Sequence, residues 1–316
     1  MKKVSLLLAF LSLLGIATGC SRAAAPNGQI PPMPAKIQQF EDGVPVIQVY
    51  VVEQQSVEEM PLEEYLCGVV AGEMKNDWPM EALKAQAIIA RTFALKFMTE
   101  KESKYDGAFV STDFEEAQAY DKSSVNERVK QAVEETRGLV LSNAGALPYT
   151  WFHAHSGGKT ALAKEALNWK EDEPPYTMVT EGRESDKAPK ESNEWTATFT
   201  KAQIIEAAKT AGANITNLDS AAIGEKGESG RAITLKLGGQ DVNAPDFRIA
   251  IGSTEMRSTF LTDLKAEGDH VTMSGKGFGH GVGMSQWGAY GLAEQNKKAE
   301  EIVLSYFKDV EVVKMY

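Results

Sequence analysis

Residues 61–98 read PLEEYLCGVVAGEMKNDWPMEALKAQAIIARTFALKFM and predict two consecutive helices, at 61–74 and at 79–98. At about 100° per residue, the large apolar side chains of the first helix fall in one stripe. The members of this stripe are Leu62, Tyr65, Leu66, Val69 and Val70. We therefore expect this helix to pack against a core.

Glu73 lies within about 20° of the centre of that stripe, whereas Glu63 and Glu64 fall outside it. The pattern predicts that Glu73 alone of these carboxylates points inward. Apolar surroundings disfavour an ionised carboxylate, so we expect the pKa of Glu73 to lie above its ordinary value of about 4.3. A general acid working near neutral pH needs this property. In the alternative, Glu73 ends the helix, turns to solvent or pairs with a structural arginine such as Arg91.

The second helix carries a stripe of mostly small residues that is flanked by Gln86 and Arg91. Small residues allow neighbouring backbones to approach closely. We expect these two polar side chains either to face Glu73 or a ligand, or to hydrogen-bond buried backbone groups.

Two glycine-rich segments stand out, WFHAHSGGKT at 151–160 and GKGFGHGVGMSQWGAYG at 275–291. In the first, Gly157 and Gly158 permit positive backbone angles and close approach of a ligand. Its Ser156 is not in a G-x-S-x-G elbow, which argues against serine hydrolysis. In the second, alternating glycines leave one face bare, so a flat substrate or another backbone can lie against it. The spacing matches no phosphate-binding loop.

The histidines of these segments leave a metal site open as an alternative. His153 and His155 point the same way if the segment is a strand, and His280 is a third candidate ligand. Glu73 would then act as the base beside a zinc ion.

Predicted helices and strands follow one another without a regular βαβ repeat, which indicates an α+β fold. Strands are expected at 44–60, 138–153, 231–238 and 269–274, and further helices at 201–211, 285–296 and 299–307. The first helix and the two glycine-rich loops are expected to build a cleft. The polar, proline-containing stretch 171–192 predicts a long loop or a boundary, and a smaller subdomain is expected at about 171–268 within a domain at 45–316.

The composition excludes several classes of protein. The chain of 316 residues has 44 acidic and 33 basic residues and a net charge of -11. Binding to nucleic acid by electrostatic attraction alone is therefore not expected. Its two cysteines exclude a disulfide scaffold and any four-thiolate metal site.

Residues 1–20, MKKVSLLLAFLSLLGIATGC, have the features of a bacterial export signal. The apolar run from Val4 to Ala17 is shorter than the roughly 20 residues that span a bilayer. The ending at Cys20 resembles a lipobox, which predicts lipidation of Cys20 and an extracytoplasmic protein anchored to the membrane. A plainly cleaved secretory signal is the alternative. Residues 21–44 are expected to form a proline-containing linker.

Five motifs together resemble the stage II sporulation protein D (SpoIID/LytB) family, over about residues 46–316. They are GVVAGEM, WPMEALKAQAIIARTFAL, FHAHSGGKT, WTATFTKAQI and GKGFGHGVGMSQWGA. The resemblance implies a lytic transglycosylase that acts on peptidoglycan glycan strands after an amidase has removed their stem peptides, during engulfment of the forespore. Its product would be a 1,6-anhydro sugar at the N-acetylmuramic acid end.

The resemblance also implies roles for individual residues. The catalytic acid of the family is the glutamate of the first motif, which is Glu73 here. The positions that match the cleft of the family are His153, Ser156, Gly157, Gly158, His280, Ser285 and Gln286. Gln86 and Arg91 are further candidates for binding the sugar. Some relatives are associated with zinc held partly by cysteine, but no cysteine lies near the FHAHSGGKT segment here, so no cofactor is expected.

The resemblance further suggests partners, namely a cell-wall amidase and a membrane complex of sporulation. LytB-type relatives are described as modifiers of autolysin activity. The alternative function is therefore a non-catalytic, glycan-binding enhancer of a cell-wall amidase.

Overall fold

The structure is a computed structural model and describes residues 28–316. The predicted export signal at 1–20, Cys20 and the first part of the linker lie outside the described residues, so the predictions about them stay predictions. In the described part of the chain, no helix combines the length and the apolar character needed to cross a membrane.

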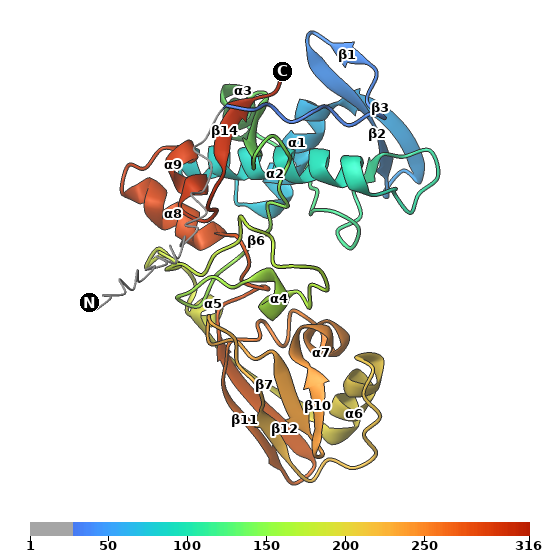
Figure 1. The fold of residues 1–316 in the computed structure, drawn as a ribbon, viewed down its shortest axis with the longest axis vertical. Helices are drawn as coiled ribbons and strands as arrows, with labels where there is room; N and C mark the ends of the chain where they lie inside the picture. Colours follow the sequence, from blue (N-terminus) through green and yellow to red (C-terminus); the bar gives the residue numbers. More distant parts are fainter. Residues whose placement is uncertain (1–27) are drawn as a thin grey trace, which may run out of the picture.

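Helices and strands are mixed as an α+β fold, as predicted, and they form an upper and a lower part (Figure 1). The upper part begins with a small sheet in which β2 pairs antiparallel with β1 and β3, and parallel with β4. These strands are β1 (Phe40–Glu41), β2 (Val44–Val51), β3 (Ser56–Pro61) and β4 (Val110–Ser111).

The long helix α2 (Met80–Glu100) is the centre of the upper part (Figure 1). All of its alanines are fully buried, and their small side chains allow other elements to pack closely around it. The elements that contact α2 are β4, α1 (Leu62–Glu73), α3 (Glu127–Glu135), β5 (Leu139–Ser142), α8 (Gln286–Glu294) and α9 (Ala299–Leu304). The strand β14 (Glu311–Lys314) pairs antiparallel with β5 and brings the C-terminus to this core.

The lower part has a hydrophobic core of its own, drawn from residues 195–273. Its main sheet has the order β11-β12-β7 and is antiparallel, and a second sheet has the order β10-β9-β8. The elements are β7 (Glu194–Thr200), α6 (Lys201–Thr210), β8 (Ala221–Ile223), β9 (Thr234–Leu237), β10 (Gln240–Asn243), α7 (Ala244–Ile251), β11 (Leu261–Glu267) and β12 (His270–Lys276). The predicted domain limits at 45–316 and 171–268 stay predictions.

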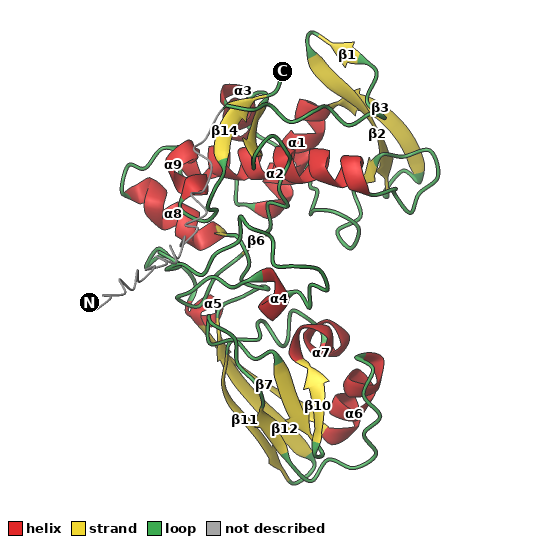
Figure 2. Cartoon of the chain, in the orientation of Figure 1, coloured by secondary structure: helices red, strands yellow, loops and turns green. Residues whose placement is uncertain are grey.

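Between the two parts, the chain is mostly loop (Figure 2). The short elements here are β6 (Phe152–His153), α4 (Ala163–Ala166), α5 (Lys190–Asn193) and β13 (Met284–Ser285). The strand predicted at 138–153 is wrong as one element, because it is divided into β5 and β6. A tight turn at Asn143–Ala146 interrupts it, with positive φ angles at Ala144 and Gly145.

The prediction that Glu73 alone points inward from α1 is wrong, because Glu63 is buried as well. Glu63 pairs with Arg91 of α2, with 2.6 Å between Nη2 and Oε2 and 3.0 Å between Nε and Oε1. Helical periodicity places Glu63 beside the apolar stripe, but it contains no information about a guanidinium on the neighbouring helix. The bidentate pair offsets much of the desolvation of both groups.

Arg91 is fully buried, and its remaining N–H groups donate to backbone oxygens of Ala87, Val133 and Leu139. No N–H of the guanidinium is left for a sugar. The expectation that Arg91 holds the substrate is therefore corrected to a structural role in the core of the upper part.

We predict that Arg91→Met lowers the free energy of unfolding by about 3–5 kcal/mol, because it leaves the Glu63 carboxylate buried without its partner. Urea unfolding followed by tryptophan fluorescence measures the change. Lys130→Met is a matched control on a surface pair with Glu127, where side-chain exposures are 57% and 89%, and it should change stability by less than about 1 kcal/mol. Normal stability of Arg91→Met combined with weakened glycan binding would restore the sugar-binding interpretation.

Candidate active site

Glu73 is the last residue of α1 and is half-buried. The backbone N–H of Ala119 donates to its Oε1 at 2.7 Å, and the Gln286 amide nitrogen lies 3.4 Å from its Oε2 and 3.0 Å from its backbone oxygen. Burial raises the pKa of Glu73 to about 7, although the hydrogen bonds from Ala119 and Gln286 act in the opposite direction. This agrees with the inward position and raised pKa expected from the helical pattern.

The contact from Ala119 depends on two glycines of α1. A Cβ atom at Gly68 would lie 2.2 Å from the Tyr120 ring, and one at Gly72 would lie 2.8 Å from the Tyr120 backbone nitrogen. The segment 119–121 therefore lies directly on the helix, and the Asp121 N–H donates to the Gly68 oxygen at 2.9 Å. Ala119 could not be identified from the sequence, because a backbone donor carries no side-chain signal.

Glu73 lines a hollow of about 430 Å³ together with its chain neighbours at 71–77 and Ser124. None of the residues of the two glycine-rich segments lines this hollow. The predicted cleft between the helix and both segments thus stays a prediction.

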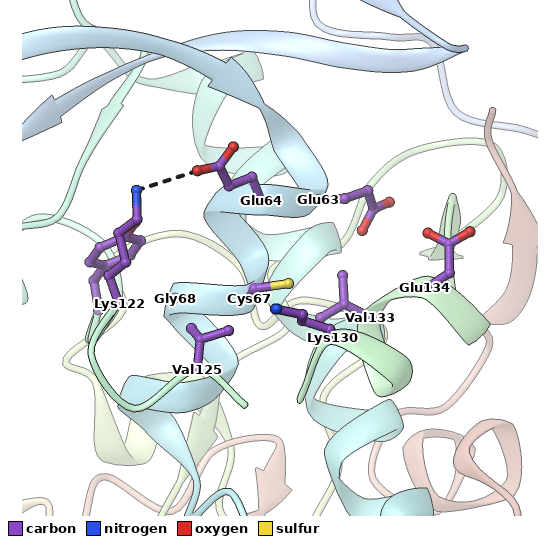
Figure 3. A pocket seen from close by; sticks show the side chains of 10 residues that line it. Glu63, Glu64, Cys67, Gly68, Lys122, Val125, Lys130, Val133 and Glu134 are labelled. Carbon is purple, nitrogen blue, oxygen red and sulfur yellow. Dashed lines mark hydrogen bonds and ion pairs between the residues drawn. The ribbon is translucent and has the colours of Figure 1, made fainter. Parts of the chain in front are cut away.

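A second cavity, of about 550 Å³, lies between α1 and α3 and contains Cys67 (Figure 3). At its rim, Glu64 is paired with Lys122 at 3.4 Å between Oε1 and Nζ. None of the predicted site residues lines it, so we do not assign the candidate chemistry to this cavity.

The two glycine-rich segments pack against each other. His155 and Phe278 exchange backbone hydrogen bonds of 3.0 and 2.8 Å, and β6 pairs parallel with β13. The second segment has positive φ angles at Gly277, Gly279, Gly281 and Gly283. A Cβ atom at Gly277 would lie 2.7 Å from the His155 oxygen, and one at Gly283 would lie 2.0 Å from the Trp151 oxygen. The sequence allowed either a flat substrate or another backbone to lie against the bare glycine face. The structure places another backbone there.

His153 is buried and its ring Nδ1 faces the Val282 oxygen at 3.2 Å. Burial lowers its pKa well below the ordinary value, and nearby His280 adds to the effect. His280 accepts the Val282 N–H on Nδ1 at 3.0 Å, and burial lowers its pKa to about 3. Both rings are therefore neutral at physiological pH, and their centroids lie 5.8 Å apart.

The zinc alternative does not fit this arrangement. Among residues 28–316, no group of three or more His, Cys, Asp or Glu side chains could hold a metal ion. The three histidines and Glu73 are thus not gathered into one ligand set.

Among the predicted site residues, Gln286 contacts Glu73 directly. Ser156 and Ser285 are linked to each other through Glu184, which was not predicted. Its Oε1 accepts the Ser156 N–H at 2.8 Å and the Ser285 hydroxyl at 3.1 Å. Ser285 also caps α8 by accepting the Gly288 N–H at 3.2 Å. Glu184 could not be identified from the sequence, because it lies in a polar stretch with no motif.

The other candidates have separate environments. Gln86 is fully buried in α2, and within residues 28–316 both polar atoms of its amide lack a hydrogen-bond partner, so it bonds neither Glu73 nor the backbone. Its predicted contact with a ligand stays a prediction. Gly157 has a φ of 72° and is packed against Lys276, whereas Gly158 has a φ of 111° and open space where a Cβ would lie. Only Gly158 of this glycine pair leaves room for a ligand.

Two family models match the chain. One, described as stage II sporulation protein, covers residues 50–142, and the other, described as a domain of unknown function, covers residues 146–283. The first match contains Glu73, and the second contains most of both glycine-rich segments.

Full-length relatives extend these matches. Stage II sporulation protein D of Bacillus subtilis is 32% identical over 285 residues, which are 84% of this chain and 78% of that protein. An uncharacterized protein of Brachyspira hyodysenteriae is 33% identical over 81% of this chain and 68% of its own length. The amidase enhancer of Bacillus subtilis is 28% identical over 77% of this chain, but only 39% of the enhancer is covered. At this identity and coverage, the chain belongs to the stage II sporulation protein D family.

Proposed function

We propose that the protein is a peptidoglycan lytic transglycosylase, which cleaves the bond between N-acetylmuramic acid and N-acetylglucosamine in peptide-free glycan strands and leaves 1,6-anhydro ends. Membership of the family supports a role in the cell wall and in sporulation. The observation that carries the proposal is Glu73, a half-buried acid with a pKa of about 7 at the end of α1.

In this mechanism, protonated Glu73 donates its proton to the glycosidic oxygen. The Ala119 N–H donates to Oε1 at 2.7 Å, whereas the Gln286 amide reaches Oε2 only at 3.4 Å, so we assign the proton to the more weakly bonded Oε2. The resulting carboxylate then takes the proton of the muramic acid C6 hydroxyl, whose oxygen attacks the anomeric carbon. The bond to the leaving sugar breaks and a 1,6-anhydro ring forms.

One carboxylate is sufficient for this reaction. Ordinary glycosidases use two carboxyl groups, one of them to activate water or to act as the nucleophile. Here the substrate supplies its own nucleophile at high effective concentration. A pKa of about 7 suits a group that acts first as an acid and then as a base near neutral pH.

The site is proposed to act outside the cytoplasm. A lipid on Cys20 and the residues that directly follow it would tether the enzyme to the membrane while it reaches glycan strands. The later part of the predicted linker at 21–44 is packed on the upper part, because Ile37 is buried in its core and β1 pairs with β2. An amidase that strips stem peptides would supply the enzyme's substrate, and a sporulation membrane complex is the expected setting.

A second function is favoured by one comparison, the match to an amidase enhancer. In this alternative, the chain binds glycan strands without cleaving them and raises the activity of a cell-wall amidase. Glu73 would then contribute to binding only.

The first prediction separates these functions by their products. Wild type should release glycan fragments with 1,6-anhydro ends from amidase-treated cell wall, and mass spectrometry identifies these ends. Glu73→Gln removes the acid but keeps the shape of the side chain, so turnover should fall by at least about 10³-fold while glycan binding is retained. Reducing ends in place of anhydro ends would indicate hydrolysis. Binding without cleavage, together with stimulation of an added amidase that survives Glu73→Gln, would favour the enhancer.

The second prediction concerns pH. Because the reaction starts from protonated Glu73, kcat should be constant at low pH and decline as the pH rises through about 7. Gln286→Ala should move this decline to higher pH, because the Gln286 hydrogen bond lowers the pKa of Glu73. Tyr65, which also interacts with Glu73, keeps its proton here since burial raises its pKa. A decline near pH 4.5 would contradict the assignment.

The third prediction concerns stability. The pKa of Glu73 is about 7 in the folded protein against 4.5 for a free glutamate, so the folded state binds its proton more tightly and loses stability as the pH rises between these values. Glu73→Gln removes this effect. It should raise the free energy of unfolding by about 2–3 kcal/mol more at pH 8 than at pH 5, as measured by urea unfolding. An equal change at both pH values would mean that Glu73 ionises normally.

A further inference from the structure

A second buried carboxylate, Glu184, lies beside the candidate site without a cationic partner. Its side chain is 11% exposed, and within residues 28–316 no lysine or arginine reaches ion-pair distance from it. The nearest basic group is His155, whose Nδ1 lies 4.0 Å from Oε1. This nitrogen accepts the Gly157 N–H at 3.0 Å, so it carries no proton toward Glu184.

A buried carboxylate is held only where hydrogen bonds replace its water. For Glu184 these come from Ser156 at 2.8 Å and Ser285 at 3.1 Å, both to Oε1. Ser156 belongs to the first glycine-rich segment and Ser285 begins α8. One oxygen atom therefore joins two segments that are far apart in the sequence.

The backbone around Glu184 holds the same helix. The Ser185 N–H donates to the Trp287 oxygen at 3.1 Å. A Cβ atom at Gly288 would lie 2.1 Å from the Gly182 oxygen, and one at Gly291 would lie 2.4 Å from the Arg183 oxygen. Residues 182–185 therefore pack directly against α8, and the Glu184 carboxylate accepts a hydrogen bond from its N-cap, Ser285.

The first turn of α8 matters because Gln286 follows Ser285 and contacts Glu73. A chain of contacts runs from Glu184 through Ser285 to Gln286 and on to the carboxylate of Glu73. A misplacement of about 1 Å at a reacting group is enough to reduce a rate by about 10²-fold.

We propose that Glu184 is a positioning residue, which fixes the start of α8 so that the Gln286 amide is held against Glu73. This inference rests on the proposed function, in which Glu73 is the catalytic acid. It assigns no contact between Glu184 and the substrate. Its consequence is that the loop at 171–192 takes part in setting the acidity of Glu73.

The test measures the pKa of the Glu73 side chain directly, by ¹³C NMR of full-length protein carrying glutamate labelled at Cδ, with the signal assigned through Glu73→Gln. Glu184→Ala should raise this pKa, in the same direction as Gln286→Ala, because both withdraw the amide. The double variant Glu184→Ala/Gln286→Ala should show no further rise. Glu184→Gln keeps an oxygen acceptor for both serines and should stay close to wild type.

Two further variants control for folding and for local charge. Ser285→Gly removes the hydroxyl bound to Glu184 while glycine still serves as an N-cap, so it should reproduce the shift even where Glu184→Ala folds poorly. Glu181→Ala removes an exposed carboxylate three residues away and should leave the pKa of Glu73 unchanged. Near-ultraviolet circular dichroism checks that each variant is folded.

On amidase-treated glycan, Glu184→Ala should lower kcat by about tenfold or more with little change in KM. A folded Glu184→Ala with an unchanged pKa of Glu73 would overturn the proposal, as would a double variant in which the two shifts add. The NMR measurement does not depend on catalysis. An inactive wild type would therefore contradict the proposed function, whereas the pKa of Glu73 in the variants would still test the role of Glu184.

Discussion

The chemistry proposed for this protein depends on a carboxyl group that is buried among neutral hydrogen-bond donors. Glu73 receives the Ala119 N–H and the Gln286 amide, and burial still keeps its pKa near 7. An arginine in the same place would hold it ionised and remove its use as an acid. Three segments from distant parts of the chain must meet at the end of α1 to create this environment.

Three carboxylates that are wholly or partly buried show how the neighbouring groups determine the role of a glutamate. Glu63 has the Arg91 guanidinium and joins helices in the core. Glu73 has neutral donors and no cation, namely the Ala119 N–H and the Gln286 amide, which suits the proton transfer that we propose for it. Glu184 has a backbone N–H and a serine hydroxyl, and it connects the first glycine-rich segment to the start of α8. The residue type is the same in each case, and the neighbouring donors make the difference.

Glycine has a structural role throughout the site, because it lets backbones touch where any Cβ would collide. Gly68 and Gly72 admit the segment that carries Ala119, and Gly277 and Gly283 admit the backbone of 151–157. From the lower part, Arg231 adds a link by donating to the Lys159 oxygen at 2.8 Å and to the Ser156 oxygen at 2.5 Å. The lower part therefore supports the first glycine-rich segment, although its own core is separate.

The sequence by itself determined the α+β class, the limits of the long helices to within about two residues, the family resemblance and the inward position of Glu73. These follow from periodicity and from motifs, which are local properties of the chain. Only the tertiary structure showed that Glu63 is also buried, that Arg91 belongs to the core, and that Ala119 and Glu184 surround the site. Those facts depend on which segments pack together, and a backbone N–H or an arginine on another helix leaves no mark in the local pattern of a sequence.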